Sequence, residues 1–374
     1  YRADPARTGY TAENLPSALS LAWTFESRHA PRPAWPSRTR QRFDVAYQPV
    51  IAGQYLYFGS SADGKIYALD AAQGRLRWEF FTGGPVRFAP VAWRDRVLVA
   101  SDDGYLYCLA AADGRLIWKH RGGPRPDMLL GNDRMVSRWP ARGGPVVVND
   151  GVYFAAGIWP SEGVYVYALD AASGRVVWCN DSSGTLELDQ PHPTARARSG
   201  VAAQGYLVSD GNRLYVPTGR GVPAVFDRGE GKFLSLNLQP NTSLGGADVV
   251  GLGDWFFNSG AMFDASSQTL IARTGLAVAL HPDYLILSGS KPGGLVVLDR
   301  KQMVVERPAV DRKGAAITTR SLAEPLWTLD LPEAALLRPA QRPGTEKPEG
   351  KQMGSTSWIE LSILAGQADF FGAS

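Results

Sequence analysis

One phrase occurs three times in this 374-residue chain, and its first two copies lie about 40 residues apart. Each copy has a β-rich run, a Gly-Arg turn and a tryptophan three residues after the arginine. The copies cover residues 64–78, 104–118 and 164–178. A repeat at this period indicates one supersecondary unit built again and again, because such units bury their apolar faces only against neighbouring copies.

The first copy belongs to a unit of four short extended runs, at residues 47–52, 55–58, 65–69 and 75–80. Each run is β-rich, and each gap carries Gly or Asp, which are turn residues. No window of the unit has helical periodicity. The pattern predicts four antiparallel strands, which is one blade of a β-propeller.

The repeated positions have physical roles of their own. The glycines of the turns are expected to need positive φ, and the aspartates to accept hydrogen bonds from turn amides. The tryptophans are expected to bury their rings between neighbouring blades, with the indole N–H bonded to an acceptor. We assign such structural roles to Asp70, Gly74, Trp78, Gly114, Trp118, Asp170, Gly174 and Trp178.

We therefore expect one all-β domain over residues 1–374, a β-propeller with seven or eight blades of four antiparallel strands. A closing strand is expected at 21–25. The blades are expected at about 46–80, 86–120, 144–179, 205–236, 247–272 and 276–330, with a partial blade at 358–374. The partial blade follows from residues 364–373, which repeat the blade opening at 51–60 before the sequence stops.

The repeat resembles the pyrroloquinoline-quinone-type repeat, in which Ala-x-Asp, a glycine turn and a tryptophan follow one another. The opening at residues 2–10 is similar to the lead-in of bacterial members of this class. The resemblance implies either the fold of a quinoprotein alcohol dehydrogenase or that of the non-enzymatic scaffold lipoprotein of outer-membrane protein assembly.

The resemblance also implies what a quinone site would need. The dehydrogenases carry adjacent cysteines over the cofactor and a Glu/Asn/Asp set that holds Ca²⁺. Here the two cysteines, Cys108 and Cys179, lie far apart in the sequence, and no acidic cluster has the spacing of a calcium cage. We expect no cofactor, and pyrroloquinoline quinone with Ca²⁺ stays the alternative.

Composition narrows the classes of function. The net charge of +3 gives no reason to expect a nucleic-acid partner. No apolar run approaches the ~20 residues of a transmembrane helix. The four histidines lack metal-ligand spacing, and no nucleophile elbow, phosphate loop or dinucleotide fingerprint is present. We expect neither catalytic residues nor a metal site.

Four long insertions interrupt the repeat, at 27–44, 121–142, 180–204 and 239–247. They fall between blades and on one face of a propeller, and long loops in compact domains are usually functional or disordered. Arginine beside tryptophan suits carboxylate, phosphate, sulfate and planar ligands, although such arginines can also form an ordinary solvated surface. The candidate ligand face comprises Trp35, Arg38, Arg40, Arg134, Arg138, Trp139, Arg142, His192, Arg196 and Arg198.

The function expected from these features is that of a non-catalytic, periplasmic or otherwise extracytoplasmic scaffold. Its insertion-rich face would bind a protein or an anionic small molecule or glycan, and the protein would be a monomer. The alternatives are a quinone-dependent alcohol or sugar dehydrogenase, and the propeller domain of a longer multidomain enzyme.

Overall fold

The computed structural model describes residues 2–14, 20–35, 43–131, 133–190, 195–219, 221–238, 245–290, 294–310 and 314–330, and the backbone of 361–365. The described part consists of 33 strands and one short 3₁₀ turn, Pro160–Glu162. The chain forms two compact units. The 11–141 unit also contains residues 337–374, and the 142–336 unit also contains residues 1–10. The sequence predicts one ring over the whole chain. Such a ring depends on how the two units join, so it stays a prediction.

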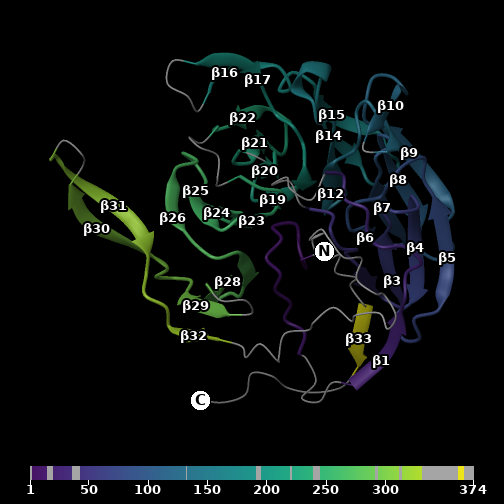
Figure 1. Cartoon of the computed structure of the whole chain (residues 1–374), viewed down its shortest axis with the longest axis horizontal. Coiled ribbons are helices and arrows are strands. Elements are labelled where there is room, and N and C mark those ends of the chain that lie inside the picture. The colour runs from purple at the N-terminus through teal and green to yellow at the C-terminus, as the bar shows by residue number, and fades with distance from the viewer. Residues whose placement is uncertain are drawn as a thin grey trace, which may run out of the picture. The chain divides into compact units, whose positions relative to one another are not determined.

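The 11–141 unit contains two four-stranded antiparallel sheets (Figure 1). The first consists of β2 (Val50–Ala52), β3 (Tyr55–Gly59), β4 (Lys65–Asp70) and β5 (Leu76–Phe81). The second consists of β6 (Val91–Trp93), β7 (Arg96–Ala100), β8 (Tyr105–Ala110) and β9 (Leu116–Arg121). Two further pairs are antiparallel: β1 (Ser20–Phe25) with β33 (Leu361–Ala365), and β10 (Met128–Gly131) with β11 (Arg134–Ser137).

The 142–336 unit contains four larger sheets. The first consists of β12 (Gly143–Val148), β13 (Gly151–Ala156), β14 (Tyr165–Asp170) and β15 (Val176–Asn180), with β18 (Gly205–Tyr206) added in parallel to β12. The second consists of β19 (Val208–Asp210), β20 (Arg213–Val216), β21 (Ala224–Asp227) and β22 (Phe233–Ser235).

The other two sheets of this unit follow in chain order. One consists of β23 (Val249–Leu252), β24 (Trp255–Asn258), β25 (Ala261–Asp264) and β26 (Leu270–Arg273). The other consists of β27 (Ala277–Leu280), β28 (Tyr284–Ser288), β29 (Leu295–Asp299) and β32 (Trp327–Leu329). Two separate hairpins are β16 (Leu186–Asp189) with β17 (Arg196–Ser199), and β30 (Val304–Val310) with β31 (Ala316–Leu322).

The repeated phrase forms the third and fourth strands of its sheet in the same register each time. Its tryptophan pairs with a small residue of the preceding strand, and the register shifts immediately afterwards. The three pairs are Ala68 with Trp78, Cys108 with Trp118, and Ala168 with Trp178. A bulge at a fixed place re-aims a side chain in the same way in each copy.

Trp78 of the first sheet lies against the turn of the second. Its indole Nε1 donates a hydrogen bond to the carbonyl oxygen of Ala111 at 2.9 Å. Gly114 of that turn has φ of +71°, and a Cβ there would lie 2.5 Å from Cε3 of the Trp78 ring. The glycine is needed both for its backbone conformation and for the close approach of the ring.

The same contact recurs with two other tryptophans. Trp23 of β1 donates to the Ala71 carbonyl at 3.0 Å and covers Gly74. In the 142–336 unit, Trp178 donates to the Arg228 carbonyl at 3.1 Å and lies over a turn glycine of the β19–β22 sheet. Each indole therefore joins two consecutive sheets through packing and one hydrogen bond.

Residues 2–9 lie along the edges of consecutive sheets in the 142–336 unit. The carbonyl oxygens of Pro5, Ala6 and Thr8 accept hydrogen bonds from the amides of Ser209, Gly251 and Leu280, each at 2.9 Å. These amides belong to β19, β23 and β27, which are the edge strands of their sheets. The segment thereby satisfies edge groups that would otherwise need another partner.

Arg7 anchors this segment in the interior of the 142–336 unit. The residue is only 4% exposed. Its guanidinium donates to the carbonyl oxygens of Pro145 at 2.8 Å and Leu207 at 3.3 Å, and lies 5.3 Å from the ring centre of Tyr206. A buried cation held by carbonyl groups and an aromatic ring joins the segment to the sheet of β12 and β18 and to Leu207, which follows β18.

Replacing Gly114 with alanine is expected to lower the free energy of unfolding by about 2–5 kcal/mol, because a left-handed backbone and a collision with Trp78 act together. Gly53→Ala is the matched control. Gly53 has φ of +58°, and a Cβ added there would meet nothing within 4 Å, so its loss should be about 1 kcal/mol. Equilibrium urea unfolding measures both losses, and equal values would contradict the packing role of the Trp78 ring.

Arg7→Ala is expected to destabilise the protein by about 2–3 kcal/mol, since it removes charge-assisted hydrogen bonds from a buried place. Arg175→Ala removes an arginine from an exposed turn of the same unit and should change stability by less than about 0.5 kcal/mol. Thermal unfolding followed by circular dichroism compares the two variants. An unchanged melting temperature for Arg7→Ala would show that the segment does not stabilise the sheets.

Candidate functional site

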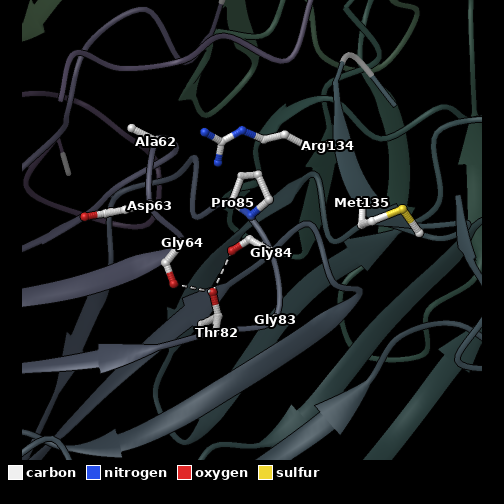
Figure 2. A pocket seen from close by; sticks show the side chains of 9 residues that line it. All are labelled: Ala62, Asp63, Gly64, Thr82, Gly83, Gly84, Pro85, Arg134 and Met135. Carbon is white, nitrogen blue, oxygen red and sulfur yellow. Dashed lines mark hydrogen bonds between the residues drawn. The ribbon is translucent and has the colours of Figure 1, made fainter. Parts of the chain in front are cut away.

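A pocket of about 310 Å³ lies in the 11–141 unit. Three chain segments form it: the link between β3 and β4, the link between β5 and β6, and the start of β11 (Figure 2). The lining residues are Ala62, Asp63, Gly64, Thr82, Gly83, Gly84, Pro85, Arg134 and Met135. Links within a sheet and links between sheets thus meet at one place.

Backbone groups form much of the pocket wall. The hydroxyl of Thr82 lies 2.9 Å from the carbonyl oxygen of Gly64 and 2.7 Å from that of Gly84, which holds the two links together (Figure 2). The amide of Gly83 donates to Oδ2 of Asp103 at 2.7 Å. A Cβ at Gly84 would lie 2.6 Å from the Asp103 nitrogen, so only glycine fits this wall.

Arg134 is the cation of the pocket. Its Nε is buried and has no hydrogen-bond partner among the residues that the structure describes. Burial lowers the pKa of the Arg134 guanidinium, and the nearby charges of Arg32 and Arg87 lower it further. Figure 2 shows the guanidinium above Pro85 and turned toward Ala62. The charge of Asp63 acts in the opposite direction and compensates part of the Arg134 charge, although the Arg134 Nε has no hydrogen-bond partner among the described residues.

Arg87 lies nearby but is fully compensated. Its guanidinium forms ion pairs with Asp44 at 2.5 Å and Asp102 at 2.6 Å, and these side chains are 4% exposed or less. It also donates to the carbonyl oxygen of Arg32 at 2.7 Å. Burial raises the pKa of the Asp44 carboxyl, while the charge of Arg87 opposes that shift.

This ion network fastens the first insertion to both sheets of its unit. The amide of Ala34 donates to Asp44 at 2.8 Å, and the amide of Arg32 donates to Oγ of Ser61 at 2.8 Å. The sequence offered one signal for it: Asp102 stands where the first copy of the repeat has Ala62. A charged residue at a repeat position that otherwise holds a small residue indicates an oppositely charged partner nearby.

The second insertion folds as the β10–β11 hairpin and its flanks. Arg138 lies 3.9 Å from Asp127, and its guanidinium is 5.7 Å from the centre of the Trp139 ring. Arg125 pairs with the same aspartate at 2.8 Å. Trp139 is only 3% exposed and packs against Gly123. Trp139 therefore supports the hairpin from inside and offers little surface to a ligand.

The two faces of the hairpin differ. Leu130 pairs with Met135 across the strands, and the two are 73% and 53% exposed. Met128, two residues from Leu130 and on the same face, is also exposed. Val136 and Arg134 alternate with Met135 along β11; Val136 is buried, and Arg134 lines the pocket. The hairpin thus presents apolar side chains on one face and Arg134 on the other, and Met135 also borders the pocket.

Apart from Arg134, none of the predicted face residues that the structure describes lines this pocket. Trp35 is half-buried in the 11–141 unit. Arg38, Arg40 and His192 lie outside the described residues. Arg142 is 4% exposed in the 142–336 unit, where its carbonyl oxygen accepts the amide of Gly205.

Arg196 and Arg198 lie on β17 of the 142–336 unit. They are exposed, and they pair across the β16–β17 hairpin with Asp189 at 3.9 Å and Glu187 at 3.7 Å. Exposed pairs of this kind contribute little to stability. Of the ten predicted face residues, Arg134 lies in the β10–β11 hairpin, and Arg138 and Trp139 follow directly after it.

Comparison with known proteins adds the family. A family model described as outer membrane protein assembly factor BamB matches residues 20–232, more than half of the chain. The chain belongs to this family. No curated protein sequence matches the chain significantly.

Solved structures share the fold at low identity. A europium-containing methanol dehydrogenase is 14% identical, with a TM-score of 0.51 over 87% of this chain and 76% of the other. A quinohemoprotein alcohol dehydrogenase from Pseudomonas putida HK5 is 15% identical, with a TM-score of 0.51 over 82% of this chain and 56% of the other. BamB from Moraxella catarrhalis is 16% identical, with a TM-score of 0.45 over 73% and 74%. The expected all-β propeller fold and the expected family are confirmed; the number of blades stays a prediction.

The described residues do not fit the quinone and calcium site that the resemblance implies. They include no group of three or more His, Cys, Asp or Glu side chains that could hold a metal ion. Both cysteines are free thiols: Cys108 is buried in β8, and Cys179 lies in β15. We therefore derive no chemical step through a quinone.

A membrane-crossing helix is also absent from the described ranges, where no helix has the length and hydropathy to span a bilayer.

Arg87→Met is expected to destabilise the protein by about 3–5 kcal/mol at pH 7, because it leaves buried carboxylates without their cation. Arg77→Met is the matched control: Arg77 also pairs with an aspartate at 2.5 Å, but its side chain is 52% exposed. Its loss should stay below about 1 kcal/mol. Chemical unfolding at pH 7 measures both variants.

The same variant makes a prediction about pH. Without Arg87, burial raises the pKa of Asp44 unopposed, so the folded variant binds a proton more tightly than the unfolded chain. Its stability should therefore rise as pH falls from 7 to 5, relative to the wild type. A stability difference that is constant with pH would contradict the buried-carboxylate explanation.

Proposed function

We propose that this protein is a non-catalytic, extracytoplasmic scaffold in outer-membrane protein assembly, and that the β10–β11 hairpin is its protein-binding surface. The family model supports the process. The observation that carries the surface is the outward face of the hairpin, formed by Met128, Leu130 and Met135.

The composition of this face suits a protein partner. Exposed apolar side chains that are contiguous on one face mark an interaction site more strongly than scattered ones. Methionine is adaptable and is common at binding surfaces. Arg125 and Arg138 flank the hairpin and supply a polar rim around an apolar centre. A rim of arginines also favours an acidic partner surface.

A photo-crosslinking residue at Leu130 is expected to capture an envelope protein of the assembly machinery in cells of the native host. The same residue at Leu76 is the control, since Leu76 is 51% exposed on β5 of the same unit. Mass spectrometry identifies the adducts. The same adducts from both positions, or none from position 130, would contradict the proposed surface.

Leu130→Asp is expected to weaken binding of that captured partner by at least about tenfold, whereas Leu76→Asp should leave it unchanged. Neither side chain is buried, so both variants should unfold like the wild type.

The non-catalytic role has its own test. The purified protein is incubated with pyrroloquinoline quinone and Ca²⁺, and dye reduction is followed with alcohols and aldoses. Sustained turnover would overturn the scaffold proposal in favour of a dehydrogenase or the propeller domain of a longer enzyme.

A further inference from the structure

The charges around the pocket are unequally balanced. Arg87 has two buried aspartates, and Arg32 pairs with Asp133 at 3.7 Å near the surface. Arg134 forms neither a side-chain hydrogen bond nor an ion pair within the described part of the chain. Arg134 is therefore the guanidinium of this cluster that has no ion-pair partner among the described residues.

The acidic residue of the pocket lining forms its hydrogen bond with a residue other than Arg134. Asp63 lines the same pocket, but its Oδ2 accepts a hydrogen bond from the Tyr67 hydroxyl at 2.5 Å. Figure 2 shows its carboxylate pointing away from the Arg134 guanidinium. Its other oxygen, Oδ1, is buried and forms no hydrogen bond within the described residues, so Asp63 acts on Arg134 through its charge and not through a hydrogen bond.

Gly83 and Gly84 form part of the pocket wall. A Cβ at Gly83 would lie 2.9 Å from the Asp103 carboxylate, and one at Gly84 would meet the Asp103 backbone. A side chain at either position would therefore collide with Asp103, so glycine is required in this part of the pocket wall. The cavity of about 310 Å³ is larger than a carboxylate needs and admits the side chain that carries it.

The charge and the geometry select the class of ligand. A guanidinium presents N–H groups in a planar fork that matches a carboxylate. Because the carboxylates of Asp63 and Asp103 lie nearby, the pocket favours a monoanion over a dianion such as phosphate.

We infer that this pocket is a carboxylate-binding subsite in which Arg134 binds the anion. The carboxylate comes from an acidic side chain of the partner that covers the β10–β11 hairpin, and this source rests on the proposed function. Arg134 and Met135 are consecutive in β11, so a partner on the outward face lies within reach of the pocket.

The test uses the intact protein labelled with ¹⁵N in arginine. The probes are N-acetylglutamate amide, which has one side-chain carboxylate, its neutral glutamine analogue, succinate and inorganic phosphate. The Arg134 Nε–H resonance is expected to shift saturably with the glutamate probe and to stay unchanged with the glutamine analogue.

Variants connect binding to the residue. Arg134→Gln is expected to weaken binding of the glutamate probe about 10- to 100-fold, read by calorimetry or by other shifted resonances. Arg134→Lys keeps the positive charge but lacks the planar fork of N–H groups, so it should recover part of the affinity for the glutamate probe. Arg125→Gln is the matched control, because Arg125 is exposed near the hairpin and does not line the pocket.

The outcomes separate the alternatives. Succinate binding more tightly than the glutamate probe would support the carboxylate subsite with a free acid as its source. Phosphate binding more tightly than either, or an Arg134 resonance that no probe shifts, would overturn the inference. If Leu130→Asp releases the partner and Arg134→Gln does not, the inference that the partner supplies the carboxylate is overturned. The proposed binding surface on the hairpin stands in that case.

Discussion

The contact between an indole ring and a turn glycine is the interaction on which the described sheets depend. A four-stranded sheet of short strands cannot bury both faces alone, so its stability comes from the next sheet. Trp78 over Gly114, Trp23 over Gly74 and Trp178 over Gly231 each supply apolar area and one hydrogen bond at the junction. The glycine and the tryptophan are both required, because a Cβ would occupy the volume of the ring.

Sheet edges pose a second constraint, since unpaired strands invite pairing with other chains. In the 142–336 unit the N-terminal segment occupies successive edges with its own carbonyl groups. Arg7 then fixes the segment to the buried carbonyl oxygens of Pro145 and Leu207. A segment without regular secondary structure therefore has a structural role as specific as that of a strand.

Two arginine side chains of the 11–141 unit differ in the charges that surround them. Arg87 is desolvated and pairs with two aspartates, and these ion pairs hold the first insertion in place. Arg134 is desolvated at Nε and has no ion-pair partner among the described residues, although the charge of Asp63 acts on it, and this makes it a candidate for binding an external anion. Both arginines carry the same charge, so the difference between them comes from the groups that surround each guanidinium.

The sequence by itself determined the strands, the turn glycines and the family resemblance, because these depend on local propensity and on a pattern that repeats at a fixed period. It also located the insertion that carries Arg134 and Arg138. It did not separate exposed arginines from buried ones: Arg142 is buried, and the importance of Arg87 was missed. Tertiary structure decided these points, since burial and charge compensation depend on residues that are distant in the sequence, such as Asp44 and Asp102 around Arg87.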